Sequence, residues 1–139
     1  MRQSDQPVSA MLPAHARIGK TLETLDRLMA CQPPPAEILV HVAASQMEMR
    51  AALEPYAADI RLLVSDINPG PGGARNRMLQ AASHELVASF DDDSYPTDPD
   101  FFVCPPRCFD SLPEASILAL NIHEPRDPVP QREGSPRPV

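Results

Sequence analysis

The stretch that decides the fold is Leu86-Val87-Ala88-Ser89-Phe90-Asp91-Asp92-Asp93-Ser94-Tyr95-Pro96, an apolar run followed directly by three aspartates. The run from Leu86 to Phe90 has the length and composition of a buried strand. Adjacent carboxylates repel one another, and the repulsion is costly in the low dielectric at the end of such a strand. A chain that places three aspartates there either leaves them in water or supplies them with a cation.

Apolar runs of strand length recur on both sides of this stretch. Short apolar runs bounded by proline, glycine and polar residues are typical of buried strands. Together with the run before the aspartates they predict five strands, at Val8–Leu12, Ile38–Val42, Ile60–Val64, Leu86–Phe90 and Ile117–Ile122.

Helical patterns separate these runs. Apolar side chains repeat every three to four residues over Ile18–Met29, which predicts an amphipathic helix. A second helix is predicted after Ser45, with Ser45 as its N-cap and Glu48 as the capping-box partner. A third is predicted over Ala74–Ser83, and a short helix is predicted to start at Asp98.

Alternation of strands with helices predicts the α/β class, with a mostly parallel sheet and helices on both faces. In such sheets ligands bind beyond the carboxyl ends of the strands. We therefore expect four polar segments that follow predicted strands to gather at one edge of the sheet: Pro13–Arg17, Ala43–Ser45, Asp66–Gly73 and Asp91–Tyr95.

Length and composition exclude several classes of protein. The 139 residues suffice for one domain, and 42% hydrophobic residues suffice for its core. A formal net charge of -7 argues against nucleic acid or an anionic membrane as the partner. No apolar run approaches the ~20 residues of a membrane span. Three cysteines form no even framework, which favours thiols in a reducing cytoplasm. We divide the chain into an extension (1–7), a domain (8–123) and an irregular, Pro-rich tail (124–139).

The glycine-rich segment Gly70–Arg77 admits two interpretations. Glycines allow close backbone approach, a helix N-terminus favours an anion, and Arg75 and Arg77 add positive charge, so the segment could support a phosphorylated ligand. Alternatively, the glycines only form a tight turn into the helix. The segment lacks the Gly-Lys-Ser/Thr ending of a P-loop and the third glycine of the dinucleotide motif, where Arg75 stands.

The aspartates also admit more than one interpretation. Carboxylate oxygens suit Mg²⁺ or Mn²⁺, and Mg²⁺ typically combines one or two carboxylates with substrate phosphates. A calcium-binding EF-hand is excluded, because its sixth position would be Pro96 and its twelfth Phe102. A solvated acidic turn is the remaining alternative. Elsewhere, His41 is expected to be a packed, hydrogen-bonded side chain, and the Cys104–Cys108 spacing does not predict a zinc site.

Taken together, these segments resemble the first half of a family 2 glycosyltransferase with the GT-A fold. Residues 8–17 are similar to the opening strand of that family and the turn after it, and 37–42 to its second strand. Residues 68–77 resemble its glycine-rich Ala-Arg-Asn segment, and 90–102 its Asp-x-Asp motif. The last two motifs are specific, and they occur in the expected order and spacing.

The resemblance implies a nucleotide-diphosphate sugar as ligand, with Mn²⁺ or Mg²⁺ as cofactor. It implies that Asp93 coordinates the metal, with Asp91 as the other metal-site residue and Asp92 beside them as a nucleotide-binding residue. Asp91 would also hold the ribose or uridine side of the nucleotide. Arg75 would approach the nucleotide, and Pro13, His15 and Arg17 would form the wall on the base side.

The sequence departs from the family in two places that concern the nucleotide base. The family usually has an aspartate after its second strand, whereas this chain has Val42-Ala43-Ala44-Ser45. His15 stands where the family commonly has a tyrosine in the turn after the first strand.

The family's catalytic base and acceptor site lie in a second half, and nothing after Ile122 resembles that half. We therefore expect nucleotide-sugar binding, with hexosyl transfer dependent on a missing acceptor half. The alternatives for the chain are a truncated gene product, a fragment, or a part that needs a partner chain. The alternative is a non-catalytic, degenerate glycosyltransferase fragment that acts by protein interaction, including self-association through an exposed sheet edge. A third interpretation, half of a dehydrogenase, is disfavoured by the incomplete dinucleotide motif.

Overall fold

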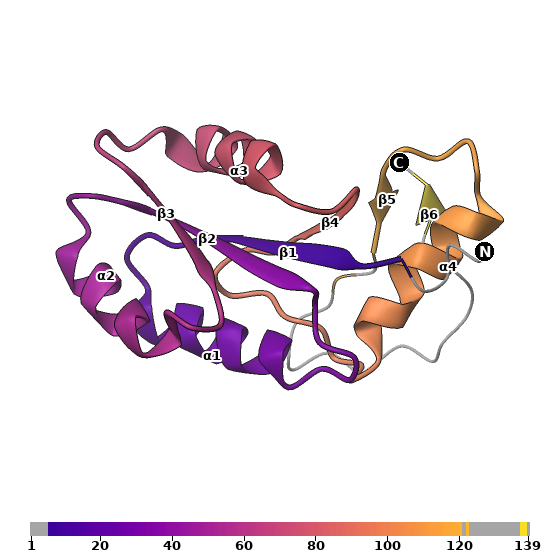
Figure 1. Ribbon diagram of the computed structural model, residues 1–139, viewed down its shortest axis with the longest axis horizontal. Helices are drawn as coiled ribbons and strands as arrows, with labels where there is room; N and C mark the ends of the chain where they lie inside the picture. Colours follow the sequence, from indigo (N-terminus) through magenta and orange to yellow (C-terminus); the bar gives the residue numbers. More distant parts are fainter. Residues whose placement is uncertain (1–5, 121, 123–136, 139) are drawn as a thin grey trace.

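A four-stranded parallel sheet forms the centre of the molecule, in the strand order β3-β2-β1-β4 (Figure 1). The computed structural model describes residues 6–120, 122 and 137–138. Each strand coincides with a predicted apolar run, and β1 pairs with both β2 and β4. The strands are β1 Val8–Pro13, β2 Glu37–Ala43, β3 Arg61–Ser65 and β4 Leu86–Ser89.

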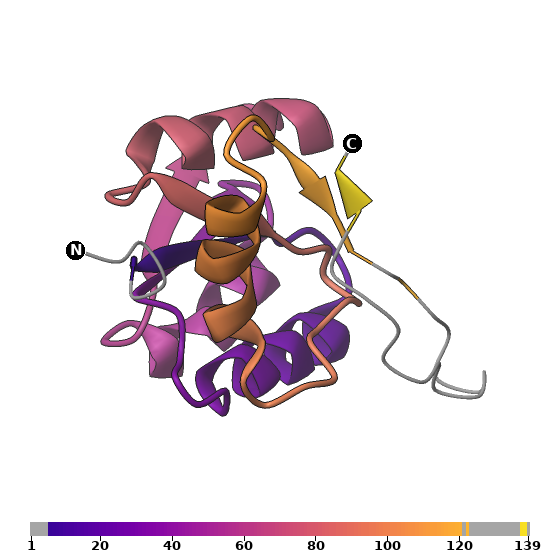
Figure 2. The same cartoon turned by 90° about the vertical axis from the view of Figure 1, so that its right-hand side faces the viewer.

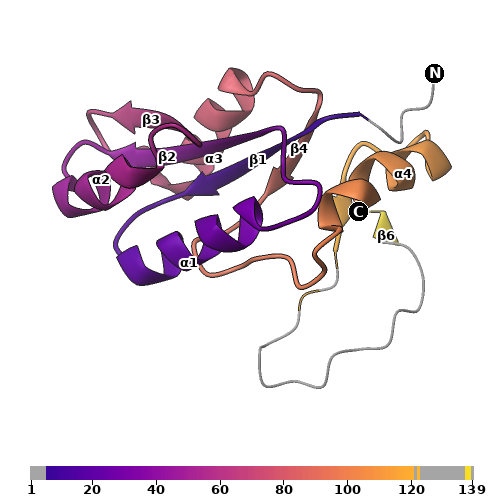
Figure 3. The ribbon, with the colours of Figure 1, turned by 60° about the horizontal axis from the view of Figure 1, so that its bottom comes forward.

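Helices cover both faces of this sheet (Figures 1 and 3). Helix α1 (Ile18–Met29), helix α2 (Met47–Leu53) and the short 3-10 helix η2 (Glu54–Tyr56) lie on one face. Helix α3 (Gly70–Ala81) lies on the other. The predicted α/β class, with a parallel sheet between helical layers, is confirmed.

A further helical segment lies across the amino-terminal edge of the sheet (Figure 2). It consists of the 3-10 helix η3 (Phe101–Val103) and helix α4 (Cys104–Ser111). No helix in the described part of the chain is long and apolar enough to cross a bilayer.

The core follows from the alternation of side chains along the strands. Ala10 and Leu12 point to the face that α1 covers, where they pack with Leu25 and Leu28. The intervening Met11 points to the opposite face and packs with Leu39 of β2 and Met78 of α3. Because β1 is buried on both faces, its sequence is a nearly continuous apolar run, which is typical of central strands in parallel sheets.

Three sequence predictions require correction. The third helix begins at Gly70, within the predicted loop, because Pro71 fits the first turn of a helix. Helix α2 has Gln46 at its N-cap and no side-chain cap, so the Ser45–Glu48 capping box is wrong. The fifth strand is reduced to β5 (Leu118–Ala119), which pairs antiparallel with β6 (Arg137–Pro138) outside the main sheet.

The apolar run of the predicted fifth strand indicated strand propensity but did not indicate which strand it would pair with. Ile117 and Ile122, near the ends of this run, are 65% and 92% exposed. Apart from Arg137–Pro138, the predicted irregular tail lies outside the described residues, as do residues 1–5 of the extension.

A half-buried carboxylate links the strands at the amino-terminal edge of the sheet. Glu37 accepts hydrogen bonds from Ser9 of β1 (2.7 Å), Arg61 of β3 (2.9 Å) and the Ser83 N–H (2.5 Å). Burial alone raises the pKa of Glu37, but the bonds from Ser83, Ser9 and Arg61 together outweigh it and lower the pKa to about 2. The ionised form of Glu37 therefore stabilises the fold.

Glu37→Gln is expected to remove a pH-dependent part of the stability. Because the pKa falls from 4.5 to about 2 on folding, the contribution is present above pH 4.5 and is lost as the pH falls toward 2. The difference corresponds to roughly 3 kcal/mol. Urea unfolding at several pH values should show that the free energy of unfolding falls less steeply with acid in Glu37→Gln than in wild type. Glu54 is exposed, so the control Glu54→Gln should depend on pH as wild type does. The same pH dependence in all three proteins would refute the role of Glu37.

Candidate functional site

The three aspartates follow β4 at the carboxyl edge of the sheet, and the residue before them is anchored in the core. The Phe90 N–H donates to the Met11 carbonyl at 2.9 Å, which continues the pairing with β1. The Phe90 ring is buried and meets Phe101 and Phe102 edge-on, with centroids 5.8 and 6.2 Å away. This packing fixes the point at which the acidic segment leaves the sheet.

A tight turn then displays the carboxylates. The Asp91 N–H donates to Ser94 Oγ at 2.8 Å, and the Ser94 N–H donates to the Asp91 carbonyl at 3.2 Å. Thr24 of α1, which is 1% exposed, donates its hydroxyl to the Asp92 carbonyl at 2.8 Å. The backbone of the acidic segment is thus held by its own turn and by the helix beneath it.

Thr24→Val should destabilise the protein, because it leaves the Asp92 carbonyl without its buried donor. The expected loss in the free energy of unfolding is about 1–3 kcal/mol. Thr21→Val is the matched control: Thr21 is also buried, but the Arg17 carbonyl that its hydroxyl contacts still accepts the Thr21 N–H. Denaturant titration should therefore show a larger loss for Thr24→Val, and the reverse order would contradict this role of Thr24.

Arg17 binds two of the aspartates from the start of α1. Its Nε and Nη2 atoms donate to the two oxygens of Asp92 at 3.1 and 2.5 Å, which makes the pair bidentate. Its Nη1 atom donates to Asp93 Oδ2 at 3.1 Å. The hydrogen bond with Asp92, together with the charges of Asp92 and Asp93, raises the pKa of the Arg17 guanidinium. A planar guanidinium suits such a fork of carboxylate oxygens.

Arg75 approaches Asp91, the remaining aspartate, from α3 on the opposite face of the sheet. Its Nη2 atom forms an ion pair with Asp91 Oδ1, and its Nε atom donates to Ser89 Oγ at 3.3 Å. Residues from α1, β4 and α3 therefore meet at one edge. Three carboxylates face two guanidiniums there, which leaves one negative charge for a cation to balance.

The three carboxylates differ in what they can still bind. Both oxygens of Asp92 accept from Arg17, and its side chain is 13% exposed. Asp91 and Asp93 each use one oxygen in an ion pair, and their side chains are 63% and 44% exposed. Their remaining oxygens suit Mg²⁺ or Mn²⁺. Within residues 6–120, 122 and 137–138, no group of three or more His, Cys, Asp or Glu side chains is placed to hold a metal, so a cation here would need ligands from elsewhere.

The predicted wall for the base lies on the same edge of the sheet as the aspartates. Pro13 ends β1 half-buried, and the next residue donates its N–H to the His41 carbonyl at 2.8 Å. His15 is exposed on the loop between β1 and α1, two residues before Arg17. Of the three predicted wall residues, only Arg17 forms a hydrogen bond or ion pair with the acidic segment within the described residues.

The glycines around Gly70 are explained by the backbone. Gly70 has a φ of +76°, in the left-handed region that favours glycine, and its N–H donates to Asn68 Oδ1 at 3.0 Å. A Cβ on Gly73 would lie 2.7 Å from Pro69 Cβ. These contacts agree with the alternative in which the glycines shape the entry into α3, while Arg75 carries the electrostatic role.

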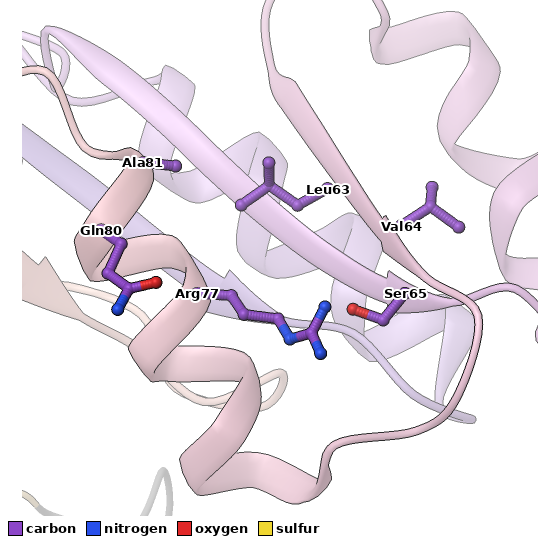
Figure 4. A pocket seen from close by; sticks show the side chains of 6 residues that line it. All are labelled: Leu63, Val64, Ser65, Arg77, Gln80 and Ala81. Carbon is purple, nitrogen blue, oxygen red and sulfur yellow. The ribbon is translucent and has the colours of Figure 1, made fainter.

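A shallow cavity of about 340 Å³ lies between β3 and α3, and the sequence did not predict it (Figure 4). Arg77 points toward Ser65 across it, and Ser65 Oγ lies 2.6 Å from Nε2 of the buried His41. His41 is thus buried and hydrogen-bonded, as predicted. Burial, with a smaller effect of Arg77, lowers the pKa of His41. The cavity lining has no carboxylate: Leu63, Val64, Ser65, Arg77, Gln80 and Ala81. Its chemistry therefore does not match that of the acidic segment.

Solved structures of glycosyltransferases share this fold. A mannosyltransferase from Pyrobaculum calidifontis, in complex with GDP-Man and Mn²⁺, is 21% identical with a TM-score of 0.71, over 91% of this chain and 38% of that one. TarS 1-349 of S. aureus, in complex with UDP-GlcNAc, is 25% identical with a TM-score of 0.68, over 90% of this chain and 37% of that one. This chain thus spans little more than a third of the length of either structure.

A third structure is the glucosyl-3-phosphoglycerate synthase of Mycobacterium tuberculosis, in complex with Mn²⁺, UDP and phosphoglyceric acid. It is 20% identical with a TM-score of 0.55, over 82% of this chain and 41% of that one. No curated protein matches the chain significantly in sequence. The sequence profile of glycosyl transferase family 2 matches residues 9–102, which include every candidate site residue from Pro13 to Asp93. The chain belongs to glycosyl transferase family 2.

Proposed function

We propose that the carboxyl edge of the sheet binds a nucleoside-diphosphate sugar together with a divalent cation, as the donor site for glycosyl transfer. The observation that carries this proposal is the convergence of Arg17 and Arg75 on Asp91–Asp93, with oxygens of Asp91 and Asp93 still available. Both the GDP-Man and Mn²⁺ complex and the UDP-GlcNAc complex are of structures with this fold.

Each side chain has a distinct proposed role. Asp91 and Asp93 hold Mn²⁺ or Mg²⁺, and the remaining metal ligands come from the diphosphate. Asp92 stays paired with Arg17 and holds that arginine at the edge. Arg75 faces the nucleotide, and Pro13 and His15 line its base side, with Asp91 near the ribose.

The chemistry that the site serves is departure of a nucleoside diphosphate from the sugar. When bound, the cation neutralises negative charge that develops on the leaving group. The guanidiniums of Arg17 and Arg75 can add hydrogen bonds to phosphate oxygens. Because this chain spans 38% and 37% of the two structures, we assign donor binding to these residues and propose that transfer needs a further acceptor half.

Calorimetry tests the proposal directly. GDP-Man and UDP-GlcNAc are titrated into the chain with Mn²⁺, and again with EDTA in place of the metal. We expect saturable heat with at least one of the two sugars in Mn²⁺, and its loss in EDTA. If the folded protein gives no saturable heat with either sugar, the proposal is wrong.

Arg75→Gln should weaken nucleotide-sugar affinity by about 10- to 100-fold, the equivalent of one charged hydrogen bond. Arg77→Gln is the matched control, because Arg77 lies on the same helix but has no ion pair with the aspartates. The same calorimetric titration should leave the control within about twofold of wild type. Equal losses in both variants would indicate a general charge effect and contradict a specific role for Arg75.

A further inference from the structure

Helix α4 brings two thiols into contact. Cys104 is the first residue of the helix and Cys108 lies one turn further along, so the two side chains share a face. Their Sγ atoms are 3.1 Å apart. Cys108 is buried at 7% exposure, whereas Cys104 is half-buried. One thiol of the pair is therefore more accessible to solvent than the other.

A disulfide between them requires the first turn of α4 to adjust. Residues four apart on an α-helix have Cα atoms about 6.2 Å apart, within the ~4.4–6.8 Å that disulfides span, but their Cβ atoms are about 5–6 Å apart, whereas a disulfide needs about 3.5–4.5 Å. A bond length of about 2.05 Å requires the sulfurs to approach by only about 1 Å. The two sulfurs are thus already in contact before any bond forms.

The remaining cysteine is in a different environment. Cys31 is 3% exposed, and its Sγ atom donates to the Arg27 carbonyl in α1. Burial raises the pKa of Cys31, which keeps it as the unreactive thiol. The chain therefore contains one contacting pair and one isolated cysteine.

We propose that Cys104 and Cys108 form a reversible disulfide on reaction with a low-molecular-weight disulfide such as oxidised glutathione. The Cys104 thiolate attacks one glutathione sulfur, the S–S bond of the glutathione dimer breaks, and one glutathione leaves. Cys108, deprotonated by solvent, then attacks the Cys104 sulfur of the mixed disulfide and releases the second glutathione. Two electrons pass from the cysteine thiols to oxidised glutathione, and their two protons end on the released glutathiones.

The sequence provides a diagnostic for this product. Arg107 lies between the two cysteines, so trypsin separates them into the peptides 78–107 and 108–126. Full-length chain is incubated with oxidised glutathione, alkylated with iodoacetamide, denatured and digested without reductant. We expect these two peptides to be joined by a disulfide that dithiothreitol breaks, while Cys31 is alkylated after denaturation. A non-reducing gel should show a monomer.

Single variants identify the order of attack. Cys108→Ser should stop at the glutathione adduct on Cys104, and Cys31→Ser should still give the joined peptides. The proposal is overturned if wild type keeps both α4 thiols alkylated, if it stops at the glutathione adduct, or if the joined peptides appear only in a dimer. A bond to Cys31 would also overturn it. Since the main observation is made on wild type, a variant that fails to fold leaves the test intact.

Discussion

Replacing Asp93 by alanine is expected to weaken Mn²⁺-dependent binding of a nucleotide sugar by about 100-fold or more. Loss of an outer-shell partner of a metal ligand already costs roughly 10–100-fold, and here a proposed ligand itself is removed. Asp93 is suited to this role because Oδ1 has no hydrogen-bond partner within the described chain and its side chain is 44% exposed. Calorimetric titration in Mn²⁺ measures the effect.

Asp59→Ala is the matched control for this loss. Asp59 is exposed just before β3, at the opposite edge of the sheet, and its removal changes the net charge by the same amount. It should bind nucleotide sugar as wild type does. Both exposed variants should unfold within about 0.5 kcal/mol of wild type. Equal affinity in Asp93→Ala and Asp59→Ala would remove Asp93 from the site.

Leu25→Ala should cause the largest loss of stability, about 2–5 kcal/mol in the free energy of unfolding. Leu25 is 0% exposed and packs in the core between α1 and the sheet, so truncation leaves a cavity. That loss is a large fraction of the ~5–15 kcal/mol that stabilises a typical domain. The midpoint of urea unfolding should fall without a change in slope.

Leu79→Ala makes the same chemical change on an exposed face. The Leu79 side chain, in α3, is 50% exposed, so its truncation removes little buried surface and should cost less than about 1 kcal/mol. If both variants lost the same stability, the assignment of the α1 stripe to the core would be wrong. The comparison of Leu25→Ala with Leu79→Ala also tests the packing of α1, the helix whose Thr24 donates to the Asp92 carbonyl.

The sequence predicted those parts of the fold that local periodicity encodes. The stripe from Ile18 to Met29 gave the bounds of α1, and the apolar runs located all four strands of the parallel sheet. Periodicity did not find the start of α3, because Gly70 and Pro71 are signals for a turn as well as for a first helical turn. It also did not show that the run around Leu118 would lack a place in the main sheet.

The sequence predicted that the segments with the aspartates and Arg17 gather at one edge, because each follows a strand of a parallel sheet, but it did not predict their ion pairs. Which arginine meets which aspartate depends on how α1 and α3 pack. The Glu37 network was missed because Ser83 lies 46 residues from Glu37 in the chain and no local pattern links them. The Cys104–Cys108 contact did have a signal: a spacing of four residues, which places both on one face of a helix.

Paramagnetic broadening of backbone amide signals by Mn²⁺, with UDP present, is the most direct test of where the donor site lies. We predict that the broadening centres on residues 91–95 and extends to the loop 13–17 and to Arg75. Signals from 57–59 and 83–85, at the opposite edge of the sheet, should stay sharp. Broadening centred on another surface, or equal at both edges, would contradict the assignment of the acidic segment as the metal and nucleotide site.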